Sequence, residues 1–491
     1  MNLLEEYIEY WDWIAFFQKE LLLFALFFFI IGSIDDLLVD FYWFWFRLNG
    51  KICTPTIETG EWAGKPLTGD AAIFIAAWNE SAVIGDTIAH TLVAWPQERL
   101  RLCIGCYRND PETIEAVMAA SGGDRRLRLV IHDCMGPSTK ADCLNRLYAA
   151  LQADEERSGQ LARMVVFHDA EDMVDPAALT LLDAGVTQAD FVQLPVLALP
   201  QKDSRWLGSH YCEEFAESHA KAMTVRGALG AALPGAGVGC AIRRSALLAM
   251  AAERGPSGPF NAKALTEDYE MGVGLGRFQA NSAFIRRRHR NGELVATRAY
   301  FPSRLDHIVK QKTRWLHGIA FQGWDRLGWR SGQAIKPVEL WMRLRDRRGP
   351  LSALVLLAGY AVLALSAVLW GGSLMGKVEP LQISPLLQAI LWVNLAAFLW
   401  RLVMRYAFTA REFGRAEGVR AILRVPIANI IAIMAGRRAV IAYIVSLFGG
   451  EAKWEKTPHF DHPARMTSGQ STADQHNLVM TDKPAAGRGS S

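Results

Sequence analysis

The amino-acid sequence predicts an α/β protein in which a domain built on a parallel sheet is flanked by membrane helices. Short apolar runs alternate with amphipathic stretches through the middle of the 491-residue chain. This alternation is typical of βαβ units, which cover both faces of a parallel sheet with helices. Apolar residues also crowd both ends of the chain, in runs long enough to cross a bilayer.

The first 17 residues form an acidic, aromatic segment, and a transmembrane helix is expected over residues 18–40. Its centre, from Leu21 to Ile31, is unbroken apolar sequence. The residues before it are acidic and no small-residue cleavage site follows, so the segment does not read as a cleavable signal peptide.

Residues 66–340 are expected to form the soluble catalytic domain. Strands are predicted over residues 71–77, 101–107, 128–132 and 163–168, and helices over residues 81–95, 111–120 and 139–155. In open sheets of this kind, ligands bind at the carboxyl ends of the strands.

Two further transmembrane helices are expected over residues 350–371 and 384–408. Arginines cluster before the first (Arg343, Arg345, Arg347 and Arg348) and around the end of the second (Arg401, Arg405, Arg411 and Arg415). Positive residues stay on the cytoplasmic side. The short loop that joins these two helices is therefore expected outside, and so is the N-terminus. Residues 41–349 then face the cytoplasm.

Residues 421–449 are apolar but contain Arg437 and Arg438. Two arginines within a membrane span are costly, so interfacial or re-entrant helices are expected, with a fourth span as the alternative. Residues 450–491 form a polar tail that is expected to be mostly disordered.

The overall composition excludes some classes of function. The chain has 53 Lys and Arg against 50 Asp and Glu, and it lacks the basic stripe of a nucleic-acid-binding protein. Its seven cysteines include one Cys-x-x-Cys, Cys103 and Cys106, without the second ligand pair that a zinc site requires. Buried, reduced thiols are expected, as in a cytosolic domain.

Three carboxylates, Asp169, Glu171 and Asp172, follow the predicted strand at residues 163–168. Like charges this close repel one another, and a divalent cation with hard oxygen ligands would offset them. Such a cation would also stabilise a diphosphate leaving group. The alternative is an acidic loop or helix start with no metal.

The sequence Thr266-Glu267-Asp268 precedes a helical run. Asp268 is a candidate general base that takes a proton from an acceptor hydroxyl, and Glu267 beside it is a second catalytic candidate. The alternative is ordinary capping chemistry, because Thr and acidic residues favour the first turn of a helix.

Gln311, Arg314 and Trp315 are spaced to share one face of a helix. Together they are suited to bind a diphosphate and to stack a sugar, although an amphipathic helix at a membrane surface would show the same pattern. A Gly-rich stretch at residues 234–244 contains Gly237, which permits close approach of the backbone to a ligand.

The order of these motifs resembles that of the processive family-2 glycosyltransferases, such as cellulose, hyaluronan and chitin synthases. The motifs are, in order, the Asn-Glu strand end, the Asp-x-acid, the Gly-rich loop, the Thr-Glu-Asp and the Gln-x-x-Arg-Trp. The resemblance covers about residues 70–315. A closer resemblance is to inner-membrane transferases of the bacteriophage adsorption protein B type. It rests on the acidic, aromatic N-terminus, the Asp-Ala-Glu-Asp form and Lys456-Thr457-Pro458-His459.

The resemblance implies a GT-A-like mixed sheet and a bacterial inner-membrane enzyme that inverts the sugar as it extends a polysaccharide. It implies Mg²⁺ or Mn²⁺, held by Asp169 with Glu171, or with Asp172 in its place. The nucleotide-sugar would be bound by Ala76, Asn79, Glu80, Asp110, Lys140 and Asp169. The acceptor and diphosphate would be bound by Gln311, Arg314, Trp315 and Gly237, with Asp268 as the base.

The expected partners are a UDP-sugar, a glycan acceptor, membrane lipid and a periplasmic or outer-membrane export partner. No nucleic acid is expected, nor the cyclic-dinucleotide domain into which the adsorption type often continues. One alternative is a single addition to a lipid phosphate, which the Gln-x-x-Arg-Trp motif argues against. Another is an inactive export or adsorption scaffold, which the intact Asp169, Asp268 and Arg314 argue against.

Overall fold

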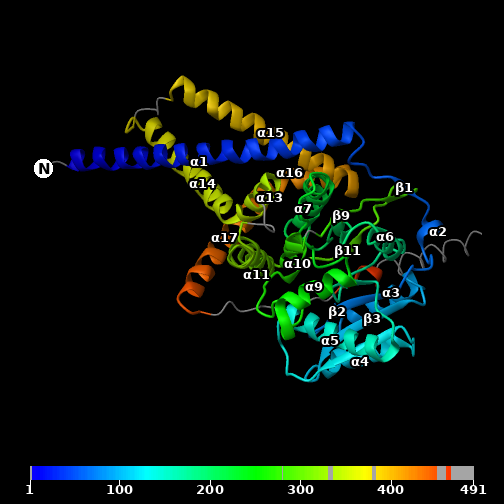
Figure 1. The fold of residues 1–491 in the computed structure, drawn as a ribbon. Helices are drawn as coiled ribbons and strands as arrows, with labels where there is room; N and C mark the ends of the chain where they lie inside the picture. Colours follow the sequence, from blue (N-terminus) through cyan, green and yellow to red (C-terminus); the bar gives the residue numbers. More distant parts are fainter. Residues whose placement is uncertain (1–2, 279, 330–335, 379–382, 451–460, 466–491) are drawn as a thin grey trace, which may run out of the picture.

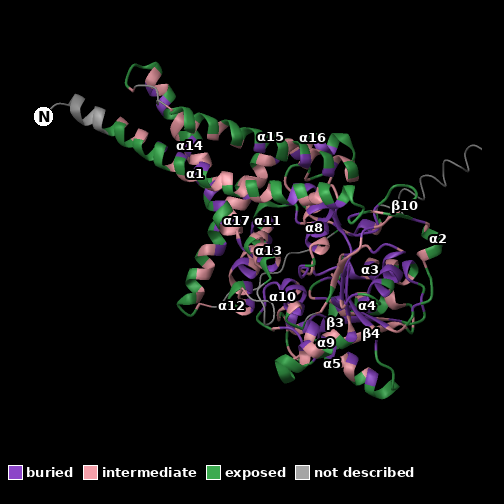
Figure 2. Cartoon of the chain, turned by 45° about the horizontal axis from the view of Figure 1, so that its top comes forward, coloured by how far each residue is buried: buried purple, intermediate pink, exposed green. Residues whose placement is uncertain are grey.

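The structure is a computed structural model, and it describes residues 3–278, 280–329, 336–378, 383–450 and 461–465. A domain built on a mixed sheet joins a set of long helices (Figure 1). The sheet domain is densely buried inside, whereas the long helices leave much of their surface exposed (Figure 2). The predicted α/β domain flanked by membrane helices is therefore confirmed.

The main sheet has seven strands in the order β4-β3-β2-β5-β8-β6-β9. The strands are β2 (Ala71–Ala76), β3 (Leu100–Tyr107), β4 (Leu127–His132), β5 (Met164–His168), β6 (Phe191–Gln193), β8 (Cys240–Arg243) and β9 (Ser282–Phe284). Strands β2 to β5 are parallel, as the βαβ pattern predicts, and β8 runs antiparallel to both of its neighbours. The sheet is therefore mixed.

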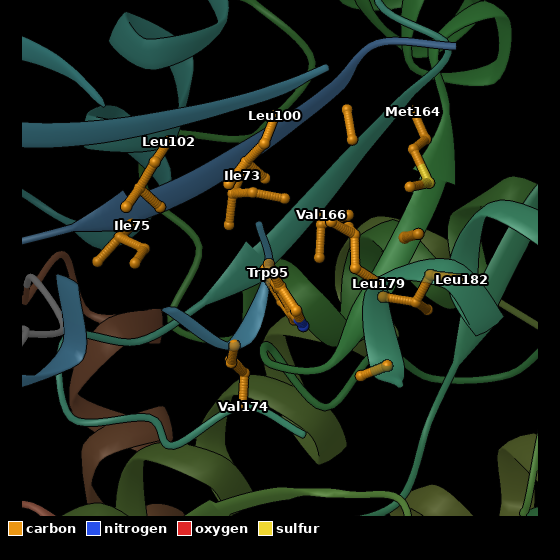
Figure 3. Close-up of a cluster of buried hydrophobic side chains, with 14 of the residues drawn as sticks. Ile73, Ile75, Trp95, Leu100, Leu102, Met164, Val166, Val174, Leu179 and Leu182 are labelled. Atoms are coloured by element: carbon orange, nitrogen blue, oxygen red, sulfur yellow. The ribbon is translucent and has the colours of Figure 1, made fainter. Parts of the chain in front are cut away.

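Both faces of the sheet are covered, which explains the continuous apolar runs of its strands. Ile73 and Ile75 point to one face and pack near Trp95 (Figure 3). Phe74 belongs to the cluster of buried side chains on the other face. The covering helices are α3 (Ile84–Ala94), α4 (Pro111–Ser121), α5 (Lys140–Ser158), α6 (Ala178–Gly185) and α9 (Arg244–Arg254). Cys103 and Cys106 are buried free thiols in β3, as predicted.

Smaller elements surround the carboxyl edge of the sheet. Two parallel pairs are formed by β1 (Thr56–Ile57) with β10 (Arg288–His289) and by β7 (Val196–Ala198) with β11 (Thr297–Ala299). The helices are α2 (Thr59–Trp62), α7 (His210–Glu217), α8 (Met223–Ala228), α10 (Glu267–Gly274), α11 (Leu305–Leu316), α12 (Gly323–Leu327), α13 (Pro337–Arg347) and α16 (Arg415–Leu423).

Four helices in the described part of the chain are long and apolar enough to cross a membrane. They are α1 (Leu3–Leu48), α14 (Gly349–Leu374), α15 (Pro385–Phe413) and α17 (Val425–Leu447). Helix α1 packs against α14 and α15, and α17 packs against α14 and α11. The membrane helices are thus in direct contact with the helix that carries Gln311.

Within residues 421–449, where interfacial or re-entrant helices were expected, residues 425–447 form α17, a single unbroken helix of 23 residues. Arg437 and Arg438 are exposed, whereas Ala435, Gly436 and Ala439 are buried. The small side chains admit close packing of α14, and a Cβ on Gly436 would lie 2.4 Å from the Cβ of Ala353. This arrangement has the length and composition of the alternative, a fourth span.

Helix α1 extends well beyond residues 18–40, and its adjacent acidic residues Asp35 and Asp36 are both ion-paired. The Asp36 carboxylate pairs with Arg348 at 2.7 Å and with Arg401 at 2.7 Å. Asp35 pairs with Arg345 and Arg348. Ion pairing is the usual condition under which carboxylates are tolerated on an apolar helix.

The C-terminal tail is only partly described. Residues 451–460 and 466–491, including the Lys456-Thr457-Pro458-His459 sequence, lie outside the described residues. Residues 461–465 are described and pack against the sheet domain. The expectation of a mostly disordered tail otherwise concerns residues that lie outside the described ones.

Candidate active site

A cleft lies at the carboxyl ends of β2 and β5, bounded by the Gly-rich loop, α10 and α11. Most of the candidate residues line it: Ala76, Glu80, Lys140, Asp169, Glu171, Gly237, Glu267, Asp268, Gln311, Arg314 and Trp315. Two candidates, Asn79 and Asp110, do not. The fold therefore brings motifs that are up to about 240 residues apart in the sequence to one place.

Lys140, the first residue of α5, is at the centre of the charged groups. Its Nζ donates to Asp169 Oδ1 and, at 3.4 Å, to the carbonyl oxygen of Gly237. It also lies 3.8 Å from Glu267 Oε1. Burial alone would lower the pKa of Lys140, but the carboxylates of Asp169, Glu267 and Asp268 raise it. Lys140 is therefore a fixed positive charge in the cleft.

The pKa values of the adjacent carboxyl groups Glu267 and Asp268 are also raised, which for these groups disfavours the charged form. Burial, followed by the charge of Asp268, raises the pKa of Glu267 to about 7. Burial also raises the pKa of Asp268, against the lowering effect of Lys140. Carboxyl groups whose pKa values are raised in this way are suited to proton transfer near neutral pH.

The Gly-rich loop and the start of α10 approach each other closely. Gly237 has φ 78°, and a Cβ there would lie 2.8 Å from Asp268 Oδ2. A Cβ on Gly235 would lie 2.7 Å from the Asp268 carbonyl oxygen. Glycine is therefore required for Asp268 to occupy this position beside Lys140.

Capping alone does not account for the Thr266-Glu267-Asp268 sequence. Thr266 is the N-cap residue of α10, but its hydroxyl makes no cap hydrogen bond and has no partner among the described residues. Asp268 Oδ1 accepts a hydrogen bond of 2.8 Å from the backbone N–H of Tyr269. Its other oxygen faces Gly237, and both residues line the cleft.

Asp172 also lines the cleft, but its carboxylate is buried and hydrogen-bonded within the turn. Its side chain is 1% exposed, and Oδ2 accepts hydrogen bonds of 2.9 Å from His168 Nδ1 and from the backbone N–H of Asp169. Asp172 therefore fixes the turn that presents Asp169 and Glu171. Of the two candidates to complete a metal site with Asp169, the geometry favours Glu171.

Two carboxylates that line one cleft fit a divalent cation whose remaining ligands come from a diphosphate and water. Among the described residues, no group of three His, Cys, Asp or Glu side chains could enclose a metal ion. A cation at Asp169 and Glu171 would therefore need further ligands from outside these side chains.

Helix α11 places Gln311, Arg314 and Trp315 on the cleft side, as their spacing predicts. Gln311 Oε1 accepts a hydrogen bond of 2.6 Å from the Tyr211 hydroxyl. The buried Nε of Arg314 has no hydrogen-bond partner in the part of the chain that the structure describes. An unpaired guanidinium N–H at a cleft is suited to a phosphate oxygen.

An aromatic wall that sequence reasoning missed surrounds Trp315. Its ring lies edge-on to Tyr211, Phe215 and Phe301, at centroid distances of 6.0, 6.4 and 6.4 Å. Tyr211 and Phe215 are spaced i, i+4 on α7 and thus share a face. That spacing was the available signal, but nothing in the sequence relates α7 to the cleft.

Asp110 and Asn79 have structural contacts beside the cleft. The Asp110 carboxylate caps α4 and accepts a hydrogen bond of 2.6 Å from the backbone N–H of Asn79. Asn79 has φ 50°, a conformation that Asn tolerates better than most residues. Asp110 thus shapes the end of β2 from behind, and Glu80 next to it reaches the cleft.

Comparison with known proteins bears on the same region. The model of the family described as "Glycosyltransferase like family 2" matches residues 69–318. The chain is 30% identical over 459 residues to bacteriophage adsorption protein B of Escherichia coli (strain K12), which covers 88% of this chain and 61% of that protein. The chain therefore spans less than two thirds of that relative's length.

Similar solved structures include a mannosyltransferase from Pyrobaculum calidifontis in complex with GDP-Man and Mn²⁺. It has 15% identity and a TM-score of 0.47, over 83% of this chain and 99% of that chain. A glucosyl-3-phosphoglycerate synthase from Mycobacterium tuberculosis, in complex with Mn²⁺ and UDP, has 17% identity and a TM-score of 0.31, over 50% of this chain and 75% of that chain. By the match to the family model over about half of its length, the chain belongs to glycosyltransferase family 2.

Proposed function

We propose that this chain is an inverting glycosyltransferase that transfers a sugar from a UDP-sugar to a growing polysaccharide with the help of Mg²⁺ or Mn²⁺. The observation that carries the proposal is the position of Asp268. It is a carboxyl of raised pKa in a cleft that also contains Lys140 and Arg314. A base is thereby placed beside two cations suited to a diphosphate.

Asp268 would take the proton from an acceptor hydroxyl as that oxygen attacks the anomeric carbon. The new glycosidic bond forms as the bond from the anomeric carbon to the diphosphate oxygen breaks. A single displacement of this kind inverts the anomeric centre. Arg314 and Lys140 offset the charge that develops on the departing nucleoside diphosphate.

Asp169 and Glu171 are the residues that would hold the divalent cation. When bound, the cation would supply Lewis-acid stabilisation of the diphosphate. Trp315 and the aromatic wall around it would position the acceptor sugar, whose apolar face packs well on aromatic rings.

The function is tested with protein purified in detergent and a panel of nucleotide-sugars. We expect one donor, a UDP-sugar, to release nucleoside diphosphate in Mg²⁺ or Mn²⁺ and to lose this activity in excess EDTA. Asp169→Asn should weaken both donor binding and turnover, because it removes a carboxylate charge from the cation site. Full turnover in EDTA would contradict the metal role, and no turnover with any donor would contradict the proposed activity.

We also propose that the enzyme lies in a bacterial inner membrane, with the sheet domain in the cytoplasm and the product passed to a periplasmic or outer-membrane partner. The arginine clusters support this orientation. Met375, after α14, would lie outside, whereas the exposed Cys53 would lie inside. Cys106 is buried and is therefore no reporter of orientation.

In intact cells, a maleimide that does not cross the inner membrane should label Met375→Cys protein but not the unsubstituted protein. After permeabilisation, the unsubstituted protein should be labelled through Cys53. Labelling of the unsubstituted protein in intact cells would reverse the proposed orientation.

A further inference from the structure

A short piece of the C-terminal segment lies against the carboxyl edge of the sheet, far along the chain from the elements it contacts. We call residues 461–465 the C-terminal clamp (Figure 1, red). His462 is 1% exposed, and Pro463 beside it is also buried. Such burial shows that these residues are part of the packed domain.

His462 contacts the turn that carries the candidate metal ligands. Its Nδ1 accepts a hydrogen bond of 3.1 Å from the backbone N–H of Ala464, so Nε2 carries the proton. Nε2 donates to the carbonyl oxygen of Asp172 at 3.3 Å. Burial lowers the pKa of His462, which agrees with a neutral ring. His462 therefore holds the Asp169–Asp172 turn from outside, as Asp172 holds it from within.

Arg465 contacts a second wall of the cleft, the segment that follows β2. Its Nε pairs with the Asp86 carboxylate at 2.6 Å, and Nη2 donates to the carbonyl oxygen of Ala82. Ala82 lies two residues beyond Glu80, which lines the cleft. One side chain thus bridges the chain entering α3 and the helix itself.

Asp461 acts on a third wall, the segment after β11, through its charge. Burial and then the charge of Asp461 raise the pKa of Tyr300, which lines the cleft. The direct contacts of the clamp are with the segments that follow β5 and β2, which are distant from it along the chain.

We propose that the C-terminal clamp is part of the donor site, with His462 and Arg465 as positioning residues that hold the strand ends in the arrangement that binds nucleotide-sugar. This inference rests on the proposed function of the cleft. Neither side chain is placed to touch the reacting atoms. Their effect is on the fraction of molecules in which the donor site is assembled, and apparent affinity falls in proportion to that fraction.

The test compares the double variant His462→Ala/Arg465→Ala with the unsubstituted full-length protein in detergent. Loss of both contacts should raise the KM for the nucleotide-sugar about tenfold and leave kcat within about twofold, because each contact contributes a modest net hydrogen bond. His462→Gln retains a donor near the position of Nε2 and should restore most of the affinity in the presence of Arg465. Arg290→Ala, which removes a surface ion pair with Glu58, is the matched control and should change neither constant.

Reciprocity gives a second readout that does not depend on turnover. If the clamp favours nucleotide binding, then nucleotide must favour the docked clamp by the same factor. UDP with Mg²⁺ should slow both tryptic cleavage after Arg465 and amide hydrogen exchange at residues 461–465. If the double variant affected folding alone, then its yield and apparent kcat would fall while its KM stayed unchanged. Nucleotide would then give the unsubstituted protein no protection at residues 461–465.

An unchanged KM in the double variant, or a lower one, would overturn the proposal, and the lower value would mean that the clamp obstructs the site. Equal proteolysis with and without nucleotide would also overturn it. If the unsubstituted protein is active, then neither of these results contradicts the proposed function of the cleft. An unsubstituted protein that neither binds nor turns over any nucleotide-sugar would overturn both.

Discussion

Asp268→Asn is expected to abolish sugar transfer while the protein remains folded and still binds nucleotide-sugar. The amide keeps the size of the side chain and can still accept the hydrogen bond from Tyr269 N–H. It cannot take a proton from the acceptor. Removal of a general base costs about 10²–10⁴-fold in rate, whereas loss of a charge at a helix N-terminus costs only ~0.3–1 kcal/mol of stability.

The measurement is nucleotide binding by calorimetry beside transfer by the same purified variant. Asp306→Asn is the matched control, because Asp306 also lies in the first turn of a helix, α11, but outside the cleft. Transfer by Asp268→Asn within a few-fold of the unsubstituted enzyme would reduce Asp268 to a residue of the helix start.

The pH dependence of transfer should agree with the same assignment. A protonated carboxyl cannot act as a base, so activity should fall as the pH falls. Because burial raises the pKa of Asp268 above its ordinary value, this loss should occur at a higher pH than for an exposed aspartate.

Arg424→Met is expected to have the largest effect on stability. The Arg424 side chain, at the junction of α16 and α17, is 0% exposed. It pairs with Glu213 at 2.7 Å and with Glu417 at 2.6 Å. Glu213 on α7 is likewise 0% exposed and also pairs with Arg405. Breaking a buried pair by removing one partner costs about 3–5 kcal/mol, because the remaining charge is left uncompensated.

The free energy of unfolding is measured in detergent micelles titrated with a denaturing detergent. Glu213→Leu/Arg424→Met removes both fully buried charges and should be less destabilised than Arg424→Met alone. Arg420→Met, which removes a more exposed partner of Glu417, should cost far less. If Arg424→Met were as stable as Arg420→Met, then the junction between α7 and the membrane helices would not depend on this ion pair.

The first four strands of the main sheet, β2 to β5, and the helices between them could be predicted closely from sequence, because their signals are local. The apolar runs of β2, β3 and β5 are continuous because both faces of the sheet are covered. In the intervening helices, apolar residues recur with the helical period. The reversal at β8 could not be predicted from the pattern itself, because a four-residue strand carries no sign of its direction. The family resemblance implied a mixed sheet but did not indicate which strand is reversed.

The candidate site could be predicted in part for the same reason. The spacing of Gln311, Arg314 and Trp315 can be recognised within the motif itself. The fold then brings this motif to the other motifs of the cleft. Asp172 could not be separated from Glu171 by sequence, because its inward direction is set by His168 and by the Asp169 backbone. The aromatic wall and the C-terminal clamp depend on contacts between segments that are distant along the chain, which no local pattern records.

The arginines of α17 left two readings open in the sequence, interfacial or re-entrant helices and a fourth span. Arg437 and Arg438 lie on the exposed side of α17, from which long side chains can extend toward the headgroups. The sequence shows how many arginines there are but not the side of the helix on which they lie, so it could not decide between the two.

The central claim, that this cleft extends a glycan with sugar from a nucleotide-sugar, is tested most directly by mass spectrometry of the product. The purified enzyme is incubated with the donor that it turns over, Mg²⁺ and a short glycan acceptor. The account predicts a ladder of products that differ by one sugar residue and that is absent with Asp268→Asn. Release of free sugar alone, with no acceptor extended, would contradict it.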